Sequence, residues 1–218
     1  MIYTKEDYDR IHKFAFSDEN PGWNPDVIES PNGDGVWDEH KRYAHLAPKY
    51  FDQASVSSPS FYTEMYSNGI FQLYHQARNE ADRICRHLDI PKEFWSADDS
   101  TLRILDYPAG ATTAPHTDFD LFTLCLYRDD MDAFKYLSGE DDPLLERARE
   151  ISPGIHFGEL MTELNGAQET EHEVLGTDNR QCSIVFFVVP NHKAILPSGI
   201  SVGKWMDERK NRSRKIKG

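Results

Sequence analysis

The sequence is poor in cysteine. Its three cysteines, Cys85, Cys125 and Cys182, stand far apart within apolar stretches. An odd number without a regular spacing excludes a small scaffold held together by disulfides and favours reduced, buried thiols. We therefore expect a protein of a reducing compartment, the cytoplasm.

Long hydrophobic runs are also missing. The longest candidate, Ile184 to Val189, has the length of a strand, whereas a membrane-spanning helix needs about 20 apolar residues. The first residues, Met1 to Glu6, become polar at once, unlike the apolar stretch of a secretory signal. We expect neither a membrane span nor a leader peptide.

Positive charge is scarce, because 24 Lys and Arg residues face 37 Asp and Glu residues and the net charge is −13. This charge disfavours nucleic acid as a partner. Residues 204–218 are the exception, with seven basic and two acidic residues. We interpret them as a solvated basic tail, and docking to an anionic partner is the alternative.

The length of 218 residues suits one domain with a sizeable core. Residues 1–58, rich in aromatic residues, Pro, Asp and Gly, predict an irregular segment of short helices and loops packed on that domain, with a turn cluster at 32–35. Residues 59–203 carry regular hydrophobic patterns and predict the domain itself. Residues 204–218 form the basic tail.

An apolar stripe predicts a helix from Ser60 to about Leu88. Its members recur at steps of three and four from Phe71 onward, charged residues fill the opposite face, and Pro91 ends the helix. After Trp95 the period changes to two, which predicts strands at 102–107, 119–127, 154–160, 168–174 and 182–189, with a helical insertion at 143–151. Short strands separated by turns indicate an antiparallel sandwich or barrel.

Two short segments carry the chemistry. Pro115-His116-Thr117-Asp118 holds a His-x-Asp pair, and Glu171-His172-Glu173 supplies one distant histidine. On a strand His116 and Asp118 would point to the same side, and a barrel can bring His172 across. Two imidazoles and one carboxylate occupy three positions around iron(II) and leave the others open for O₂ and a co-substrate.

Each of these residues also has an ordinary structural interpretation. Asp118 could cap backbone amides in an exposed turn. His156 competes with His172 for the role of distal ligand, but its neighbours in Gly154-Ile155-His156-Phe157 are apolar, and we expect a core histidine.

Roughly from Phe61 to Pro190 the chain resembles the iron(II)- and 2-oxoglutarate-dependent oxygenases of the isopenicillin N synthase-like family. The resemblance rests on the order and spacing of five stretches: residues 102–108 (Leu-Arg-Ile-Leu-Asp-Tyr-Pro), 116–124 (His-Thr-Asp-Phe-Asp-Leu-Phe-Thr-Leu), 157–166 (a strand and an Asn-Gly turn), 170–174 (Thr-Glu-His-Glu-Val, against the family's Thr-x-His-Arg-Val) and the final strand, 183–190.

The resemblance implies an α+β, mainly β fold, a double-stranded β-helix (jelly-roll) core with flanking helices. It also implies iron(II) bound by His116, Asp118 and His172. Tyr107 matches the family's tyrosine near the end of the first strand, whose hydroxyl would reach the carboxylate of 2-oxoglutarate, and Ser183 matches the serine that hydrogen-bonds the distal carboxylate.

One departure concerns the arginine that binds this distal carboxylate. The family places Arg-x-Ser on the last strand, but here Gln181 stands at the arginine position and Arg180 comes one residue earlier. On a regular strand Arg180 would face the wrong side. A β-bulge or a slipped register could turn Arg180 inward. Arg103 is a distant alternative, although its place in the strand suits an outward face.

We therefore expect a dioxygenase that uses O₂ and 2-oxoglutarate, with Arg180 as the salt-bridge partner, to oxidise a small molecule. Phe119, Phe122 and Tyr127 are candidates for the substrate wall, and Asp120 for a surface charge or a residue at the mouth. Two alternatives remain open at this stage: an iron(II) oxidase that does not use 2-oxoglutarate, and a non-catalytic jelly-roll protein that binds a partner through its basic tail.

Overall fold

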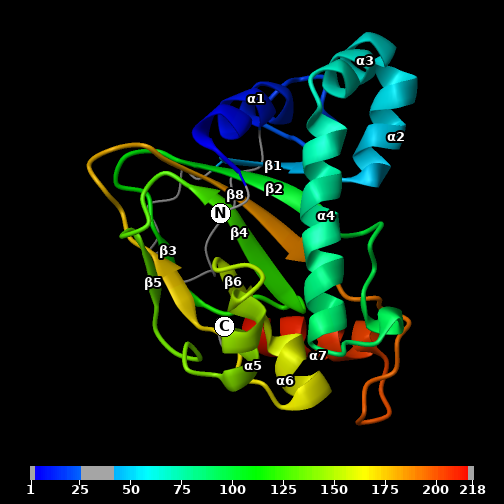
Figure 1. Ribbon diagram of the computed structural model, residues 1–218, viewed down its shortest axis with the longest axis vertical. Coiled ribbons are helices and arrows are strands. Elements are labelled where there is room, and N and C mark those ends of the chain that lie inside the picture. The colour runs from blue at the N-terminus through cyan, green and yellow to red at the C-terminus, as the bar shows by residue number, and fades with distance from the viewer. Residues whose placement is uncertain (1–2, 26–41, 216–218) are drawn as a thin grey trace.

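The computed structural model describes residues 3–25 and 42–215, with side chains as far as residue 209. The turn cluster predicted at 32–35 lies outside the described residues. Two antiparallel sheets carry flanking helices (Figure 1). The large sheet has the strand order β1 (Arg42–Leu46), β2 (Thr101–Tyr107), β8 (Gln181–Val188), β4 (Phe122–Arg128) and β6 (Ile155–Phe157). The small sheet has the order β3 (Thr113–His116), β7 (His172–Val174) and β5 (Phe134–Tyr136).

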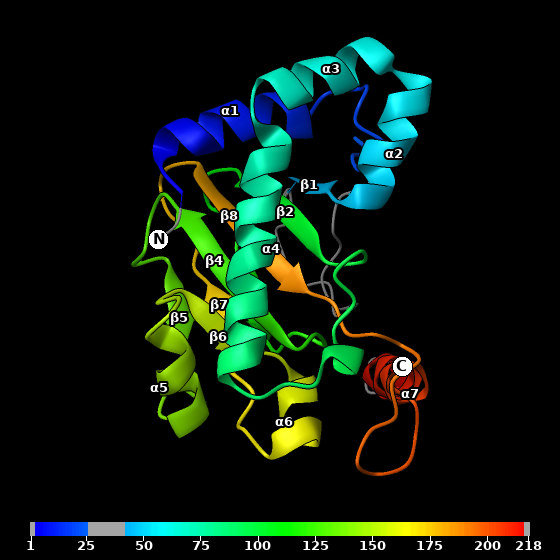
Figure 2. The same ribbon diagram turned by 45° about the vertical axis from the view of Figure 1, so that its right-hand side comes forward.

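The predicted helix from Ser60 to Leu88 is in fact two helices. Helix α3 (Pro59–Ser67) and helix α4 (Ile70–His87) are separated at Gly69, whose left-handed φ of 72° suits glycine and breaks the helical path. The apolar stripe of α4 lies against the large sheet, across which the helix runs (Figures 1 and 2). There Tyr74 meets Phe186 edge to face, with ring centres 5.7 Å apart.

The N-terminal segment holds the expected short helices, α1 (Lys5–Ala15) and α2 (Pro48–Ser57). Helix α1 begins with a capping box between Thr4 and Asp7. Strand β1, which was not predicted, pairs with β2 and completes the edge of the large sheet. Its inward residues Ala44 and Leu46 are fully buried, so this segment contributes to the core.

The chain between β4 and β7 is more helical than predicted. Helix α5 (Pro143–Arg149) confirms the helical insertion, with the Asp142 side chain capping its first turn. The region expected to continue as a strand becomes helix α6 (Glu159–Asn165), which ends at Gly166 in a left-handed conformation. A short 3₁₀ helix, Lys92–Phe94, follows α4.

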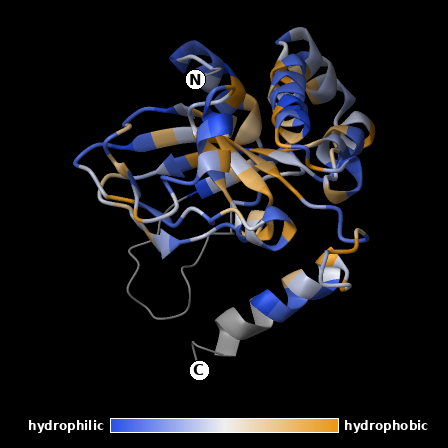
Figure 3. Cartoon of the chain, turned by 60° about the horizontal axis from the view of Figure 1, so that its bottom comes forward, coloured by the Kyte–Doolittle hydropathy of each residue, from blue (hydrophilic) through white to orange (hydrophobic). Residues whose placement is uncertain are grey.

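The basic C-terminal region forms helix α7 (Val202–Lys215). Its first turns are anchored in the core by the buried side chains of Val202 and Trp205. Figure 3 shows that hydrophobic residues gather among the strands and that α7 leads away from them. Among the described helices none is both long and apolar enough to cross a membrane.

The large sheet separates two buried regions. On β8, Ile184, Phe186 and Val188 point into the main core beneath the helices. The alternate residues Val185 and Phe187 face the small sheet and help to line a cavity between the two sheets. Because both faces are covered, β8 is buried along nearly its whole length, which explains its continuous apolar sequence.

Candidate metal centre

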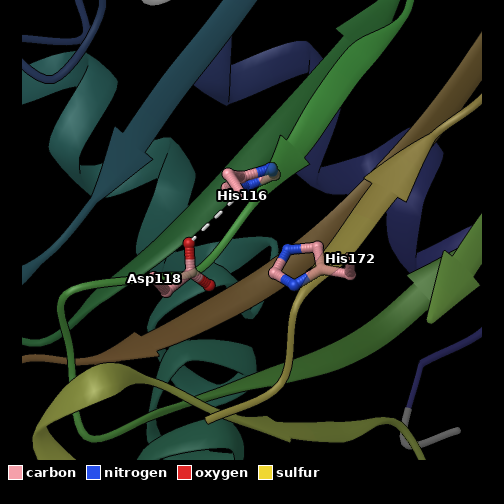
Figure 4. Close-up of side chains that lie close together, drawn as sticks. All are labelled: His116, Asp118 and His172. Atoms are coloured by element: carbon pink, nitrogen blue, oxygen red, sulfur yellow. Dashed lines mark ion pairs between the residues drawn. The ribbon is translucent and has the colours of Figure 1, made fainter. Parts of the chain in front are cut away.

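The two histidines of the predicted centre meet through the pairing of β3 with β7. His116 is the last residue of β3 and His172 the first of β7, and the two are direct partners across the antiparallel pair. Their ring centres are 4.3 Å apart. Figure 4 shows both rings beside the Asp118 carboxylate.

The sequence predicted Asp118 on the same strand as His116. In the structure Asp118 lies in the loop that follows β3. The start of α6 fixes this loop, because the Glu159 amide donates to the Asp118 carbonyl at 2.8 Å and the Gly158 amide donates to the Leu121 carbonyl at 3.0 Å. A side chain at Gly158 would collide with the Asp120 carbonyl at 2.3 Å. The glycine is therefore required for this close approach.

The three side chains present one ligand atom each, and these atoms all lie within 4.8 Å of one another. Nδ1 of His116 lies 2.8 Å from the Ala114 carbonyl, and Nδ1 of His172 lies 3.1 Å from the Thr170 carbonyl. If each Nδ1 carries the proton that these contacts favour, both Nε2 atoms are free for a metal. The set therefore fits a divalent metal ion.

The two oxygens of the Asp118 carboxylate have different neighbours. Its Oδ2 accepts a hydrogen bond from the Thr123 hydroxyl at 2.8 Å and lies 3.3 Å from Nε2 of His156. Its Oδ1 lies 3.9 Å from Nε2 of His116. One oxygen is thus held by the protein, and the other, which faces His116, is available to a metal ion.

The electrostatics keep two of the three groups, Asp118 and His172, in the states that a metal requires. Burial acts to raise the pKa of Asp118, but the hydrogen bond from His156 and the nearby imidazoles outweigh it, so the pKa lies well below its ordinary value. Burial and the neighbouring His156 ring lower the pKa of His172 to about 3. An ionised carboxylate and a neutral imidazole are the metal-binding forms.

His156 is the buried histidine that the sequence predicted, but it lies beside this centre, and Asp120, predicted to be a surface charge or a residue at the mouth, is buried there too. His156, on β6, is buried with its ring centre 4.4 Å from that of His172. Asp120 is buried, and its Oδ2 lies 2.9 Å from the Thr123 hydroxyl oxygen. Burial and the adjacent Asp118 charge raise the pKa of Asp120 well above its usual range. Only the pairing of β4 with β6 brings these residues together.

The centre opens into a cavity of about 150 Å³ between the sheets. Arg103 lines this cavity, contrary to its expected outward face, and its guanidinium lies 4.0 Å from the ring centre of Tyr43. The proposed wall residues Phe119, Phe122 and Tyr127 do not line it, and the latter two are in the helix-side core. The aromatic residues of the wall are instead Tyr107, Phe134 and Phe187.

The residues predicted to bind the co-substrate are split between the two faces of the large sheet. Tyr107 lines the cavity, and Ser183 pairs with Leu105, which also lines it. Arg180 lies on the other side, where its Nη2 donates to Oδ2 of the buried Asp106 at 2.9 Å. Neither suggested rearrangement of β8 occurs, because its pairing with β2 is regular from Thr101 to Tyr107.

Several solved structures resemble the chain. A full-length Neurospora crassa protein in complex with alpha-KG aligns with a TM-score of 0.61 and 16% identity over 94% of this chain and 81% of that one. A Shewanella oneidensis protein assigned as an oxygenase aligns with a TM-score of 0.60 and 18% identity, over 95% of this chain and 84% of that one. A Caulobacter crescentus protein assigned to the 2OG-Fe(II) oxygenase family aligns with a TM-score of 0.59 and 16% identity, over 94% of this chain and 84% of that one.

The chain has the fold of 2-oxoglutarate and iron(II) oxygenases. The resemblance expected from the sequence is thus confirmed at the level of the fold. No model of a protein family matches the sequence, and no curated protein matches it. In this oxygenase fold the His116–Asp118–His172 group is the part that could bind iron.

Proposed function

We propose that the protein is an iron(II)- and 2-oxoglutarate-dependent oxygenase acting on a small molecule. The observation that carries this proposal is the convergence of His116, Asp118 and His172 at the edge of a cavity between the sheets. Two imidazoles and one carboxylate are the donor set of non-haem iron(II) oxygenases and leave positions open for other ligands. When bound, the iron would supply the activation of O₂ that no amino-acid side chain can provide.

The chain's own residues would hold the reactants and exclude water. Tyr107 and Ser183 would contact 2-oxoglutarate, Ser183 at its distal carboxylate, and Phe134 and Phe187 would form an apolar wall of the cavity. The cavity of about 150 Å³ suits small molecules. The Neurospora crassa protein is also described with alpha-KG and 5-formyluracil, in a structure that aligns at a TM-score of 0.52 and 18% identity.

We further propose that the two sheets form a double-stranded β-helix. The cavity between the sheets and the antiparallel order of both sheets support this proposal. The catalytic domain would span residues 59–203. The described part of the N-terminal segment, residues 3–25 and 42–58, would pack on it and add β1 to its large sheet, and α7 would extend from its C-terminal end. Free cysteines at all three positions support a cytoplasmic location.

The alternative is an iron(II) oxidase that takes all its electrons from the substrate and needs no 2-oxoglutarate. The outward position of Arg180 is the observation that favours it. The two functions differ in their products, because only the first forms succinate from 2-oxoglutarate.

The test begins with anaerobic protein, to which iron(II) and then 2-oxoglutarate are added. A visible charge-transfer band that saturates at one equivalent of each supports the proposal, as does succinate released after admission of O₂. The His116→Ala variant should show no band, whereas a variant of the exposed His192 should behave as the wild type. Absence of both band and succinate in the wild type would overturn the proposed function.

A further inference from the structure

The cavity contains an arginine that the sequence did not single out. Arg128 is the last residue of β4, its side chain lines the cavity, and the residue is 6% exposed. A buried guanidinium needs a hydrogen-bonded counter-charge, because desolvation of an unpaired charge is costly. Within the described residues Arg128 forms no ion pair, and its Nε is buried without a hydrogen-bond partner.

A β-bulge explains why Arg128 points inward. Cys125 pairs with Val185, but the next partners are Tyr127 with Ile184 and Arg128 with Ser183, so β4 holds one extra residue. The extra residue places both Leu126 and Tyr127 in the helix-side core. The following residue, Arg128, is thereby turned into the cavity. A bulge was considered for β8, but it occurs on the neighbouring strand.

Ser183 lies directly opposite Arg128 on the neighbouring strand, and its side chain also lacks a hydrogen-bond partner. Its hydroxyl oxygen is buried and has no hydrogen-bond partner. Two paired residues on adjacent strands have Cβ atoms about 5 Å apart. The guanidinium and the hydroxyl are thus a group of donors that start from neighbouring positions on one face of the sheet, and a planar carboxylate is the anion that suits them.

This group lies at a suitable distance from the metal centre. Phe134 stacks on His172 with ring centres 5.1 Å apart, and the guanidinium carbon of Arg128 lies 4.4 Å from the centre of the same Phe134 ring. The guanidinium can therefore lie no farther from the His172 ring than these two distances combined. A dicarboxylate held at the metal by one end can reach it with the other.

The other candidates, at the start of β8 and on β2, are already engaged. Arg180 is on the far side of the sheet with Asp106. The side-chain amide of Gln181 donates to the Leu175 carbonyl and to the Thr177 hydroxyl, both at 3.0 Å. Arg103 is the second cation of the cavity, but it lies between the rings of Tyr43 and Phe187, at 4.0 and 5.5 Å.

We propose that Arg128 and Ser183 bind the distal carboxylate of 2-oxoglutarate, in place of an arginine on β8. This inference rests on the proposed function and names the residues that select its co-substrate. A carboxylate on the oxidised substrate would have the same chemistry, so the test must distinguish these two sources.

The test compares two keto acids on the full-length protein loaded with manganese(II), by titration calorimetry. 2-Oxoglutarate has the distal carboxylate, and 2-oxopentanoate has the same carbon chain without it. The Arg128→Gln variant should bind 2-oxoglutarate about 100-fold more weakly, with 2-oxopentanoate affinity changed less than about threefold. Ser183→Ala should show the same selectivity with a loss of about tenfold.

The controls separate the possible failures. Arg180→Gln and Arg103→Gln should retain wild-type selectivity between the two keto acids. If Arg128→Gln retains it while Arg180→Gln or Arg103→Gln loses it, or if Arg128→Gln weakens both acids equally, the assignment to Arg128 is overturned and the proposed function stands. If the manganese-loaded wild type binds neither acid, the proposed function fails and the assignment fails with it. Retained 2-oxopentanoate binding also shows that the variant is folded.

Discussion

The face of the large sheet that meets α4 and the face that meets the small sheet carry alternate side chains of the same strands. The first face is apolar, with Leu124, Ile184 and Phe186 among its fully buried residues. The second face is also buried, yet it includes Arg128 and Ser183 with polar atoms that have no hydrogen-bond partner. A buried face that leaves polar groups unsatisfied has given up stability, which is typical of a binding site.

Adjacent phenylalanines of β8 allow the two faces to be compared directly. Phe186→Ala should lower the free energy of unfolding by about 4 kcal/mol, because it leaves a void beside Tyr74 in the closely packed core. Phe187→Ala enlarges a cavity that already exists and should cost about 1 kcal/mol. Urea unfolding of the metal-free protein measures both, and equal losses would contradict the assignment of the two faces.

Loss of a metal ligand should affect the second face alone. His172→Ala removes one of three donors and should weaken manganese(II) or iron(II) binding on the order of 100-fold or more. Anaerobic titration calorimetry measures this change. His192→Ala alters an exposed histidine of a turn and is the matched control. Tight binding by the His172 variant would place the metal elsewhere.

The first face was more predictable from the sequence than the second. Period-two patterns located β2 and β8 to within one residue, because burial of apolar side chains depends mainly on local alternation. The His-x-Asp pair and the distant histidine, supported by the family resemblance, predicted His116, Asp118 and His172, which the structure brings together. The break at Gly69 lay inside a continuous helical pattern and was not recognised.

The missed residues of the site depend on pairing between distant strands. His156 comes beside Asp118 only because β6 pairs with β4, and Arg128 faces the cavity only because β4 holds an extra residue. A one-residue bulge inverts the predicted direction of every side chain beyond it. The run Leu124 to Arg128 contains no signal of its own for such a bulge.

The contact between His156 and Asp118 should tune the metal site without being essential to it. His156→Leu removes the partner of Oδ2 and should weaken metal binding about tenfold, less than loss of His172 does. Thr123→Val removes the other hydrogen bond to the same oxygen and should act in the same direction. A loss as large as that of His172→Ala would mean that His156 is itself a ligand.

The smallest expected effect concerns Arg180, which pairs with the buried Asp106 on the helix-side face of the sheet. Burial acts to raise the pKa of Asp106, but hydrogen bonds from Arg180 and Arg42 outweigh it and lower the pKa below its ordinary value. A lowered carboxyl pKa stabilises the fold above about pH 4, and this contribution is lost as the pH falls further. Arg180→Gln should therefore cost about 1 kcal/mol at pH 7.

This cost should shrink as the pH falls below about 4, because Asp106 of the unfolded chain then takes up a proton, and it should be lost once the pH falls below the lowered pKa of Asp106 in the folded protein. Urea unfolding at pH 7 and at steps between pH 5 and pH 3 measures the difference. Arg86→Gln, which breaks an exposed ion pair with Asp82 on α4, is the control and should cost less at every pH. A difference for Arg180→Gln that stays constant to pH 3 would assign its effect to lost packing. In either case the selectivity between the two keto acids should not change, because Arg180 and Ser183 lie on opposite faces of one sheet.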